Sequence, residues 1–567
     1  MENKSLPKGR QGKPVHLLLD EGALLIINPP APVEKDLHIQ VKSMEPVIRW
    51  RSVHTLMTTL RNYAEDREFP HDLLGKAQEL LEEYKKDSEG VSKVRAINLF
   101  KRLPEVWSEG MYFRTGEQKS VRKTEPLFSV IREDPLRVIQ TMQGFTREIV
   151  QQLDTLKIPY RLVDKRLPFT KPDLRKITGT RFSQKRLVIN GLQADQSGLV
   201  GAPTRYGKSR VLVNWIRCYP NLSILVVIPG ADLLKQTTAL IRELNPGREV
   251  KMIGGGSTVK YQAKAGGVTV CSVDSLHKIV SPPDLILADE PHSLVSESRI
   301  TKWDPLMSVR RLAVGATLSG RFDGRDRLIT GLFGPVLDEV TYREAVEEGA
   351  ICPLVVFFLE IEVNTQRPLK SRNKAYNELL FENRTMANTV CRIMRECVPG
   401  DWQSMTFVSH EKQADLYLKA MGGDEATIAM AKKLPGKQRD AVFARMQSGE
   451  IKRCFATNIY AQGVTFSDLR LMINAEGGGN NTSAIQKPGR LAEIREGKPY
   501  GLVVDFLFTP DNPEAESRVN QGGAEWYNLV RDSRARRKAY EDKGYEVLVV
   551  RDMPELKSKM RGYMKCP

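Results

Sequence analysis

The spacing of apolar and polar residues differs between two parts of this chain, and it changes near residue 175. Before that point, short β-like runs at Val15–Leu19 and Ala23–Ile27 precede Leu73–Lys86 and about Pro135–Leu156, which carry the three- and four-residue apolar spacing of helices. After it, short and fully apolar runs alternate with helical segments. That pattern is typical of parallel sheets, whose strands are covered on both faces by crossover helices.

The strand–helix alternation occurs twice in succession. The expected strands are Ser223–Ile228, Val268–Ser272, Leu285–Ala288 and Arg311–Gly315 in the first set, and Leu354–Glu360, Met405–Ser409, Arg453–Ala456, Leu469–Asn474 and Gly501–Phe506 in the second. Helices at Glu411–Met421 and Lys437–Met446 separate strands of the second set. We therefore predict an N-terminal mixed α/β accessory domain over 1–175, parallel-sheet α/β domains over 176–350 and 351–550, and a charged, loosely held C-terminal tail over 551–567.

Composition excludes several classes of protein. The 567 residues are 41% hydrophobic, and no apolar run approaches the ~18 residues that a membrane-spanning helix needs. The first ten residues lack the apolar segment of a signal peptide, so we expect a cytoplasmic protein. Seven cysteines are scattered without a Cys-x-x-Cys pair, which favours structural thiols over a zinc site or disulfides.

The net charge of +17 favours a polyanionic partner. Ten lysines and arginines lie between Lys157 and Arg186, against two aspartates. A second basic cluster comprises Arg531, Arg534, Arg536, Arg537 and Lys538. Each cluster has two interpretations that stay open at this point: a phosphate-binding surface, or an ordinary solvated linker and helix face.

A phosphate-binding loop is the first chemical motif. An apolar run ending at Gly201 leads into A-x-x-x-x-G-K-S and then a helix. Backbone N–H groups in such a loop surround nucleotide phosphates, Lys208 reaches the β and γ oxygens, and the Ser209 hydroxyl binds Mg²⁺. The loop predicts ATP binding by Ala202, Pro203, Thr204, Arg205, Tyr206, Gly207, Lys208 and Ser209.

Two adjacent carboxylates form the second motif. Asp289 and Glu290 follow the apolar run Asp284–Ala288. One carboxylate is needed to hold the metal with Ser209, and the other to accept a proton from the attacking water. Together the two motifs predict nucleotide hydrolysis.

Further motifs resemble those of superfamily-two helicases of the DExH type, and they occur in the same order. Asp289-Glu-Pro-His292 has the D-E-x-H form, and Arg181–Arg186 resembles the segment whose glutamine, here Gln184, reads adenine. The other matching segments are Ile228–Gln236, Thr269–Leu276, Gly315–Ser319, Thr406–Ser409, Thr457–Val464 and Gln486–Arg490. The resemblance covers about residues 176–550 and implies two tandem RecA-like domains.

A narrower resemblance concerns the XPB-like and UvsW-like helicases of DNA repair and branch migration, many of them phage-encoded. It is carried by Ile158–Arg166, Leu332–Val336, Tyr342–Ala345 and Glu348–Pro353. It implies action on branched or damaged DNA in a bacterial or phage-infected cell, beside replication or recombination proteins. RNA stays open as a substrate, since such motors contact mainly the nucleic-acid backbone.

The superfamily resemblance also implies individual roles. Ser209 and Asp289 place Mg²⁺, and Glu290 orients and deprotonates water. His292 and Gln486 couple the γ-phosphate to the second domain, and Arg490 projects across the cleft to stabilise charge. The residues implied in contact with the sugar-phosphate backbone are Pro229, Ser272, Thr317, Ser409, Thr457 and the amide of Gly463.

Two positions depart from the helicase pattern. Arg205 stands where the loop usually has a glycine, and it either strains the loop or adds a donor. The helicase segment that corresponds to Gln486–Glu493 usually ends in arginine, whereas here it ends in Glu493. This inverts a charge expected beside the γ-phosphate. Three consequences stay open: Arg495 takes that place, Arg490 acts alone, or hydrolysis is slow.

Three functions compete for these motifs. The leading interpretation is an ATP-dependent DNA helicase or translocase. A second is the motor of a restriction or defence complex, and a third is an ATP-gated nucleic-acid scaffold with weak hydrolysis. For residues 1–175, binding of duplex or forked DNA competes with docking of another protein.

Overall fold

The structure is a computed structural model that describes most of the chain. The described residues are 15–20, 22–50, 57, 60, 71–86, 112–134, 136–166, 168–193, 197–254, 256, 258–318, 324–364, 372–422, 427–430, 436–457, 468–479, 485, 487–518 and 527–565. They divide into two units, Gln40–Glu125 and the remainder, which are described separately. Gly463 and Gln486 lie outside the described residues.

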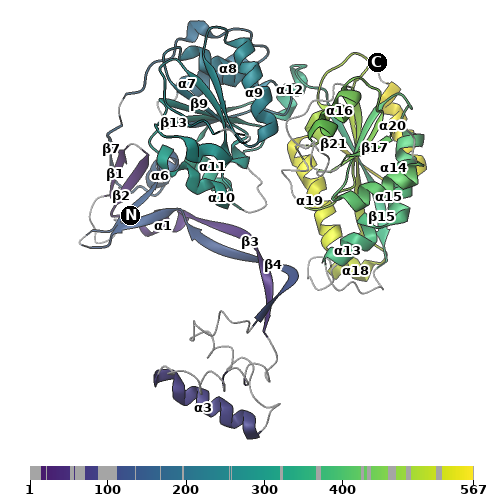
Figure 1. Cartoon of the computed structure of the whole chain (residues 1–567), viewed down its shortest axis with the longest axis horizontal. Coiled ribbons are helices and arrows are strands. Elements are labelled where there is room, and N and C mark those ends of the chain that lie inside the picture. The colour runs from purple at the N-terminus through teal and green to yellow at the C-terminus, as the bar shows by residue number, and fades with distance from the viewer. Residues whose placement is uncertain are drawn as a thin grey trace, which may run out of the picture. The chain divides into compact units, whose positions relative to one another are not determined.

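The first parallel sheet belongs to lobe 1, residues 176–350, drawn in teal in Figure 1. Its strands are β8 (Gly198–Gly201), β9 (Ile224–Ile228), β10 (Val250–Ile253), β11 (Val268–Ser272), β12 (Leu285–Asp289), β13 (Arg310–Gly315) and β14 (Val336–Glu339). The principal helices are α7 (Gln184–Gln193), α8 (Lys208–Cys218), α9 (Ala231–Leu244) and α11 (Asp326–Phe333). Every residue of β8, β9 and β11 is buried, and the sequences of β8 and β9 are accordingly continuous apolar runs.

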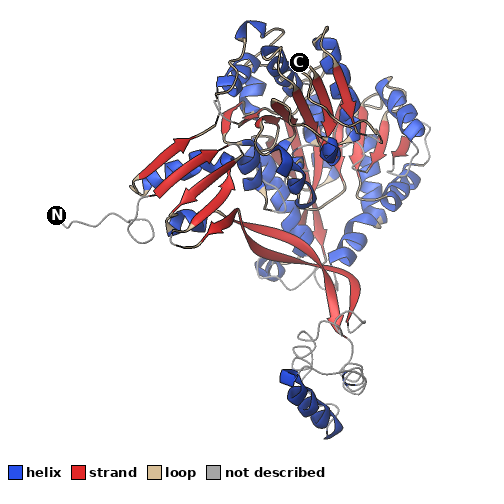
Figure 2. Ribbon diagram, turned by 60° about the vertical axis from the view of Figure 1, so that its left-hand side comes forward, coloured by secondary structure: helices blue, strands red, loops and turns tan. Residues whose placement is uncertain are grey.

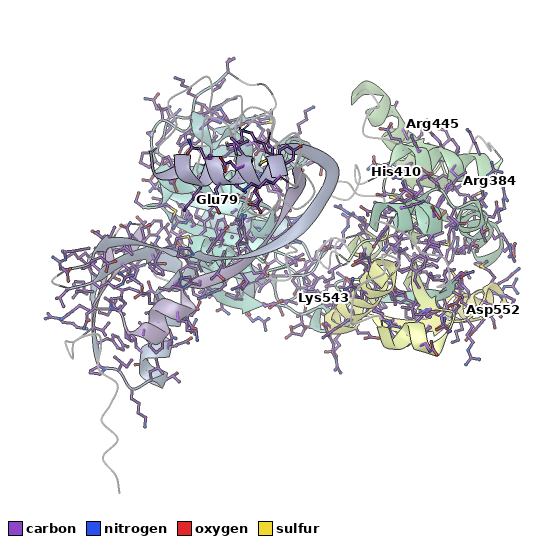
Figure 3. The ribbon with its side chains drawn as sticks, turned by 90° about the horizontal axis from the view of Figure 1, so that it is seen from below. Glu79, Arg384, His410, Arg445, Lys543 and Asp552 are labelled. Carbon is purple, nitrogen blue, oxygen red and sulfur yellow. The ribbon has the colours of Figure 1, made fainter. Side chains whose placement is uncertain are left out.

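The second parallel sheet belongs to lobe 2, residues 351–565. Its strands are β15 (Leu354–Val363), β16 (Gln403–Phe407), β17 (Thr427–Met430), β18 (Arg453–Ala456), β19 (Leu469–Asn474), β20 (Gly501–Pro510) and β21 (Glu546–Val550). Its helices include α13 (Arg372–Tyr376), α14 (Arg384–Arg392), α15 (Glu411–Met421), α16 (Gly436–Gln447), α18 (Pro513–Arg518), α19 (Tyr527–Lys543) and α20 (Met553–Lys565). His410, labelled in Figure 3, caps α15 by accepting a hydrogen bond from the Gln413 N–H at 3.2 Å.

The two sheets have the same topology. Lobe 1 has the strand order β10-β11-β9-β12-β13-β8-β14, and lobe 2 has β17-β18-β16-β19-β20-β15-β21. All paired neighbours in both sheets run parallel. Counted from the first strand of each lobe, both orders read 3-4-2-5-6-1-7. This confirms the predicted fold class of two tandem RecA-like parallel-sheet domains with an N-terminal mixed α/β part.

A packed connector joins the two lobes. Helix α12 (Tyr342–Glu347) begins with a capping box between Thr341 and Glu344. The Tyr342 hydroxyl accepts a hydrogen bond from the Leu354 N–H at 2.7 Å, and its ring meets Tyr545 edge-on at 4.7 Å. Connector residues therefore share one apolar cluster with core residues of both lobes.

The N-terminal part contains a five-stranded mixed sheet with the order β5-β6-β2-β1-β7. Its strands are β1 (Val15–Asp20), β2 (Ala23–Ile27), β5 (Phe128–Arg132), β6 (Val138–Met142) and β7 (Tyr160–Asp164). The helix expected over Pro135–Leu156 is wrong in its first half. Val138–Met142 pairs with β2 instead, and only Thr146–Thr155 forms the helix α6.

The N-terminal sheet is fixed to lobe 1 through α11. Gly144 lies so close to this helix that a Cβ there would stand 2.0 Å from the Thr330 carbonyl oxygen. Arg327 of α11 donates to the carbonyl oxygens of Asp36 and His38 and pairs with Glu148. Its guanidinium also lies over the Phe145 ring at 5.4 Å. A close backbone approach and one arginine therefore hold this sheet against lobe 1.

The described residues of the separate unit, Gln40–Glu125, include most of a long two-stranded sheet and a helix. The strands are β3 (His38–Trp50) and β4 (Tyr112–Pro126), and Figure 2 shows them as a twisted ribbon. The helix is α3 (His71–Lys86), and its buried Leu73, Ala77 and Leu80 follow the spacing that predicted it. Residues 1–175 thus include this unit as well as the five-stranded sheet.

The end of the chain differs from the loosely held tail that we expected. Strand β21 pairs with β15, and α20 follows with Leu556 and Met560 completely buried. The two apolar residues lie four positions apart on one helix face, which the many charges of this segment obscure in the sequence.

Other expectations from composition can be compared with the described residues. None of their helices is long and apolar enough to cross a membrane. The six described cysteines are buried and free of disulfides, and no group of three metal-ligating side chains lies within the described ranges. The burial of these six thiols agrees with a structural role for them.

Replacing Gly144 by alanine should loosen the N-terminal sheet from lobe 1. The new methyl group collides with backbone atoms, which cannot rotate away, so we expect a loss on the order of 1–3 kcal/mol of stability. Thermal unfolding and limited proteolysis measure the change. Gly75→Ala in α3 is the matched control, since nothing lies within 4 Å of its Cβ position. An unchanged melting temperature for Gly144→Ala contradicts this packing.

Candidate functional site

The phosphate-binding loop lies between β8 and α8. The Ala202 N–H donates to the Gly315 carbonyl oxygen at 3.0 Å, which ties the loop to the end of β13. Gly207 precedes the first residue of α8 with φ 92°, and a Cβ there would stand 2.4 Å from the Gln184 amide nitrogen. Only glycine therefore fits. The free N–H groups at the start of α8 are suited to an anion.

Arg205 adopts the backbone conformation of the glycine that it replaces. Its φ is 73°, in the left-handed region, which costs a residue with a Cβ on the order of 1 kcal/mol. Of the two consequences considered for Arg205, local strain is the one visible in its backbone.

The Lys208 ammonium lies beside the Glu290 carboxylate, although 82 positions separate the two residues. Lys208 Nζ lies 3.3 Å from Glu290 Oε1, and His292 Nδ1 lies 3.5 Å from Glu290 Oε2. Glu290 itself has φ 52°, a conformation that turns the chain sharply at the end of β12. The parallel sheet brings the two motifs together, because β12 and β8 both flank β13.

The two adjacent carboxylates have opposite electrostatic environments. Burial, and then the charge of Glu290, raise the pKa of Asp289. Burial acts in the same direction on Glu290, but Lys208 and His292 outweigh it and lower the pKa of Glu290. Glu290 therefore stays ionised and can accept a proton, whereas the charge of Asp289 needs a further cation.

A divalent cation fits the residues present here. Asp289 Oδ1 is buried and has no hydrogen-bond partner within the described parts of the chain. The Ser209 hydroxyl follows Lys208 in the first turn of α8. A hydroxyl and a carboxylate oxygen are ligands that Mg²⁺ accepts beside phosphate oxygens and water.

Gln184 lies directly against the phosphate loop. Its amide nitrogen donates to the Tyr206 carbonyl oxygen at 2.7 Å, and its amide oxygen accepts from the Arg181 N–H at 3.0 Å. The Tyr206 hydroxyl accepts from the Ser183 N–H at 2.9 Å and donates to Glu348 Oε2 at 2.6 Å. Ser183 Oγ also donates to Glu348. The segment that contains Gln184, the loop and the connector thus share one hydrogen-bonded cluster.

The role of Glu348 in this cluster was missed in the sequence. It lies 142 positions after Tyr206, just past the end of α12, where a charged residue has no distinctive local pattern. Burial, then its contact with Glu348, raises the pKa of Tyr206 to about 12, so the hydroxyl keeps the proton that it donates. The sequence hinted at this contact only through Tyr206, a tyrosine within the phosphate-binding loop.

Arg490, from lobe 2, lies near the same groups. It belongs to the short turn Pro488–Leu491, and a Cβ on Gly489 would stand 2.6 Å from the Thr204 side chain. Burial and then Arg205 lower the pKa of Arg490 to about 10, while Glu290 acts in the opposite direction. The Cys352 N–H donates to the Ala492 carbonyl oxygen at 2.8 Å, which ties the connector to this segment.

The two departures from the helicase pattern face each other. Burial lowers the pKa of Arg205, and the carboxylate of Glu493 is the charge that opposes this lowering. Glu493 Oε2 is buried without a hydrogen-bond partner in the described part of the chain. An additional positive charge on the loop therefore accompanies a negative charge on the segment opposite.

The nucleic-acid candidates lie at the carboxyl ends of strands. Pro229 follows β9, Ser272 ends β11 and Thr317 follows β13, whereas in lobe 2 Ser409 follows β16 and Thr457 follows β18. Strands β9 and β11 are neighbours, as are β16 and β18. Each pair holds the second and fourth strands of its lobe, so the candidates occupy corresponding positions. Ligands of parallel α/β sheets bind at this edge.

Comparison with known proteins identifies two domains. Residues 150–319 match the family model described as "Type III restriction enzyme, res subunit". Residues 387–495 match "Helicase conserved C-terminal domain". The first match includes the phosphate loop and the adjacent carboxylates, and the second includes Ser409, Thr457 and Arg490.

Individual relatives are distant. A protein described as a candidate helicase, from Sulfolobus islandicus filamentous virus, is 21% identical over 383 residues, which are 61% of this chain and 67% of that protein. The ATP-dependent RNA helicase dbp8 of Aspergillus clavatus is 20% identical over 72% of this chain and 80% of its own length. Among solved structures, the Type ISP restriction–modification enzyme LlaBIII bound to DNA has 12% identity and a TM-score of 0.49, covering 74% of this chain and 36% of its own.

Arg205 and Glu493 should behave as a coupled pair. Arg205→Gly leaves the Glu493 carboxylate without its nearby opposite charge, and Glu493→Arg brings a third guanidinium beside Arg205 and Arg490. We expect each single change to slow ATP hydrolysis, and the double variant to recover most of the loss. The coupling free energy should be on the order of 1–3 kcal/mol. Additive losses in the double-variant cycle contradict the pairing.

Proposed function

We propose that this chain, a superfamily-two helicase by its two matched domains, uses ATP hydrolysis to move along or unwind branched or damaged DNA. ATP hydrolysis coupled to nucleic-acid unwinding follows from the helicase domains. The choice of DNA, the branched substrate and a role in repair, recombination or replication are the further steps of the proposal.

One observation carries the proposal: the candidate nucleic-acid residues stand at corresponding strand ends in the two lobes. In lobe 1, the nucleotide-binding groups follow β8 and β12, on the two sides of β13, and β9 and β11 lie beyond β12. The corresponding strands of lobe 2, β16 and β18, carry Ser409 and Thr457. A single strand that contacts both pairs is held in two places, and a change in lobe separation then moves one grip relative to the other.

The chemistry of hydrolysis follows from the charges at the site. Lys208 and the N–H groups that begin α8 hold the phosphates. Ser209 and Asp289 would hold a Mg²⁺ ion, which would supply positive charge to the phosphate oxygens. Glu290, kept ionised by Lys208 and His292, orients the water and takes its proton. Arg490 stabilises the charge that develops in the transition state.

The connector offers a route from nucleotide binding to lobe movement. Tyr206 in the phosphate loop donates to Glu348, and four residues later Cys352 bonds to Ala492 beside the arginine segment. A nucleotide that shifts the loop therefore acts on both ends of this short stretch. His292 and Gln486 are further candidates for this coupling.

The preference for DNA rests on two features. Lobe 1 matches a subunit of a restriction enzyme, a class that acts on DNA. The basic segment between Lys157 and Arg186 also exposes most of its charges, and Leu162, Leu174 and Phe182 are exposed between them. Exposed cations on an extended segment favour a phosphate backbone. The same family match keeps the motor of a restriction or defence complex as the second candidate function.

Substitutions at the two motifs test the proposal directly. Glu290→Gln should retain nucleotide binding but hydrolyse ATP at least about a hundredfold more slowly, because the proton acceptor is lost. Lys208→Ala should lose both binding and hydrolysis. Lys251→Ala serves as the control with unchanged rates, because Lys251 is an exposed residue of β10 that pairs only with the surface residue Glu249 among the described contacts.

The same assay separates the alternatives when nucleic acid is added. Forked DNA and four-way junctions should stimulate wild-type hydrolysis more than plain duplex or RNA. Equal or greater stimulation by RNA contradicts the assignment of DNA. Tight DNA binding with no hydrolysis by the wild-type protein contradicts the helicase proposal and favours the scaffold.

A further inference from the structure

The second basic cluster lies on α19, and four of its five basic side chains have a partner within the protein. Arg534 pairs with Glu516, Arg537 pairs with Glu541, and Arg531 donates to Asn528. These three are exposed surface contacts. Arg536 is different because its side chain is 3% exposed and points into lobe 2. The cluster is therefore not a continuous phosphate-binding surface, and the buried member needs its own explanation.

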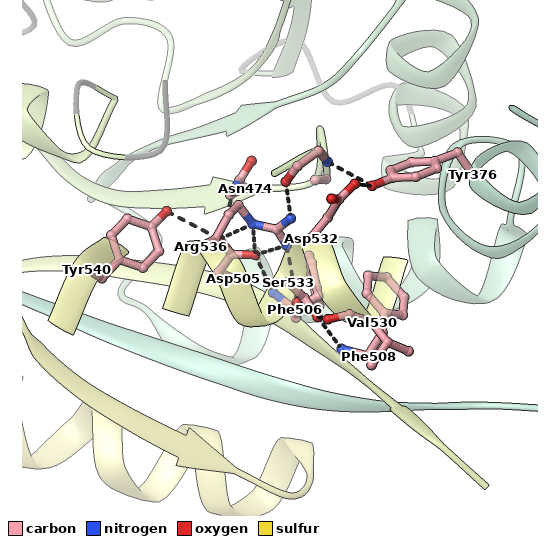
Figure 4. Close-up of polar contacts among 12 residues, drawn as sticks. Tyr376, Asn474, Asp505, Phe506, Phe508, Val530, Asp532, Ser533, Arg536 and Tyr540 are labelled. Atoms are coloured by element: carbon pink, nitrogen blue, oxygen red, sulfur yellow. Dashed lines mark hydrogen bonds and ion pairs between the residues drawn. The ribbon is translucent and has the colours of Figure 1, made fainter. Parts of the chain in front are cut away.

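The Arg536 guanidinium contacts both Asp505 on β20 and the Gly478 carbonyl oxygen in the segment after β19 (Figure 4). It lies 2.8 Å from Asp505 Oδ1 and 3.0 Å from Asp505 Oδ2, and it donates to the Phe506 carbonyl oxygen at 3.3 Å. Its remaining nitrogen donates to the Gly478 carbonyl oxygen. Asp505 is fully buried and also accepts from Asn474 at 2.8 Å and Tyr540 at 3.2 Å. A paired, fully bonded charge of this kind fixes its neighbours.

The Gly478 carbonyl belongs to a glycine turn, Glu476–Gly479, that follows β19. Gly478 has φ 76°, a conformation that favours glycine. A Cβ on Gly477 would stand 2.8 Å from the Tyr376 ring, and one on Gly479 would stand 2.6 Å from Asp532 Oδ1. The Tyr376 hydroxyl accepts from the Gly478 N–H at 3.3 Å and donates to Asp532. The turn is thus wedged between α13 and α19.

This turn is the base of the segment that carries Arg490. Lys487 pairs with Glu476, so the two ends of the stretch between them are held together. The Lys487 side chain is 3% exposed, and its ammonium lies over the Phe407 ring at 5.0 Å. Arg490 follows within the next turn. Its position relative to lobe 2 therefore depends on how firmly Glu476–Gly479 is fixed.

We propose that Arg536 is a positioning residue for ATP hydrolysis, which with Asp505 fixes the glycine turn and so aims Arg490 at the phosphate loop. The inference rests on the proposed function, because it assigns Arg490 to the hydrolytic step. Lysine cannot replace Arg536, since its single ammonium cannot reach Asp505 and the Gly478 carbonyl in the same fork geometry.

Arg536→Lys tests the positioning role, with Arg534→Lys on the same helix as the matched control. We expect Arg536→Lys to lower kcat for ATP hydrolysis about tenfold to a hundredfold, the effect of misplacing a catalytic group. The KM for ATP and the affinity for a fluorescent ATP analogue should change less than about twofold, because lobe 1 holds the nucleotide. Arg534→Lys should match the wild type. An unchanged kcat in folded Arg536→Lys protein overturns the inference.

Tyr376→Phe decides the question if Arg536→Lys does not fold. It removes one hydroxyl that links Gly478 to Asp532 and leaves the ring in place. We expect a smaller decrease in kcat with the same constant KM. A wild-type kcat for Tyr376→Phe overturns the inference in that case.

Arg490→Ala separates this inference from the function beneath it. If Arg490→Ala hydrolyses ATP at the wild-type rate, the proposed role of Arg490 fails and the positioning inference fails with it. If Arg490→Ala is slow and Arg536→Lys is not, only the positioning inference fails. The double variant should be no slower than Arg490→Ala alone, whereas additive losses contradict action through Arg490.

Discussion

Parallel pairing of the central strands is the constraint on which the rest of the structure depends. Parallel strands present all their carboxyl ends at one edge of the sheet, so residues that follow different strands become neighbours. In lobe 1 this places the phosphate loop, the end of β12 and the end of β13 in succession along the edge. The identical strand order of lobe 2 reproduces the edge with different side chains. The position of the candidate site therefore follows from a strand order that occurs in both lobes.

The buried charges at this edge of the sheet depend on neighbouring opposite charges, because burial removes them from water. Lys208 helps to lower the pKa of Glu290, whereas burial and the charge of Glu290 raise the pKa of Asp289 despite Lys208. Charges removed from water are stable only when opposite charges or hydrogen bonds compensate them. The facing segment follows the same rule, because Glu493 accompanies the unusual Arg205, and Asp505 compensates the buried Arg536. The departures from the helicase pattern thus form part of one electrostatic arrangement.

The sequence predicted the ten central strands of the two lobes and missed their four edge strands. Central strands such as β8 and β9 are buried on both faces, so their residues are continuously apolar. The missed strands β10, β14, β17 and β21 all lie at sheet edges. Lys251 interrupts the apolar run of β10, Asp338 and Glu339 interrupt that of β14, and Val336 is 45% exposed. The helix expected from Pro135 was wrong because pairing with distant β2 outweighs local spacing. Contacts such as Tyr206 with Glu348 have no local signal, since they join residues far apart in the chain.

Photocrosslinking of single-stranded DNA tests the central claim most directly. DNA carrying a photoreactive base would be bound to the full chain in the presence of a non-hydrolysable ATP analogue, and the crosslinked peptides identified by mass spectrometry. The account predicts crosslinks in both lobes, at the ends of β9 and β11, which carry Pro229 and Ser272, and of β16 and β18, which carry Ser409 and Thr457. Crosslinks confined to one lobe, or absent from these strand ends, would contradict it.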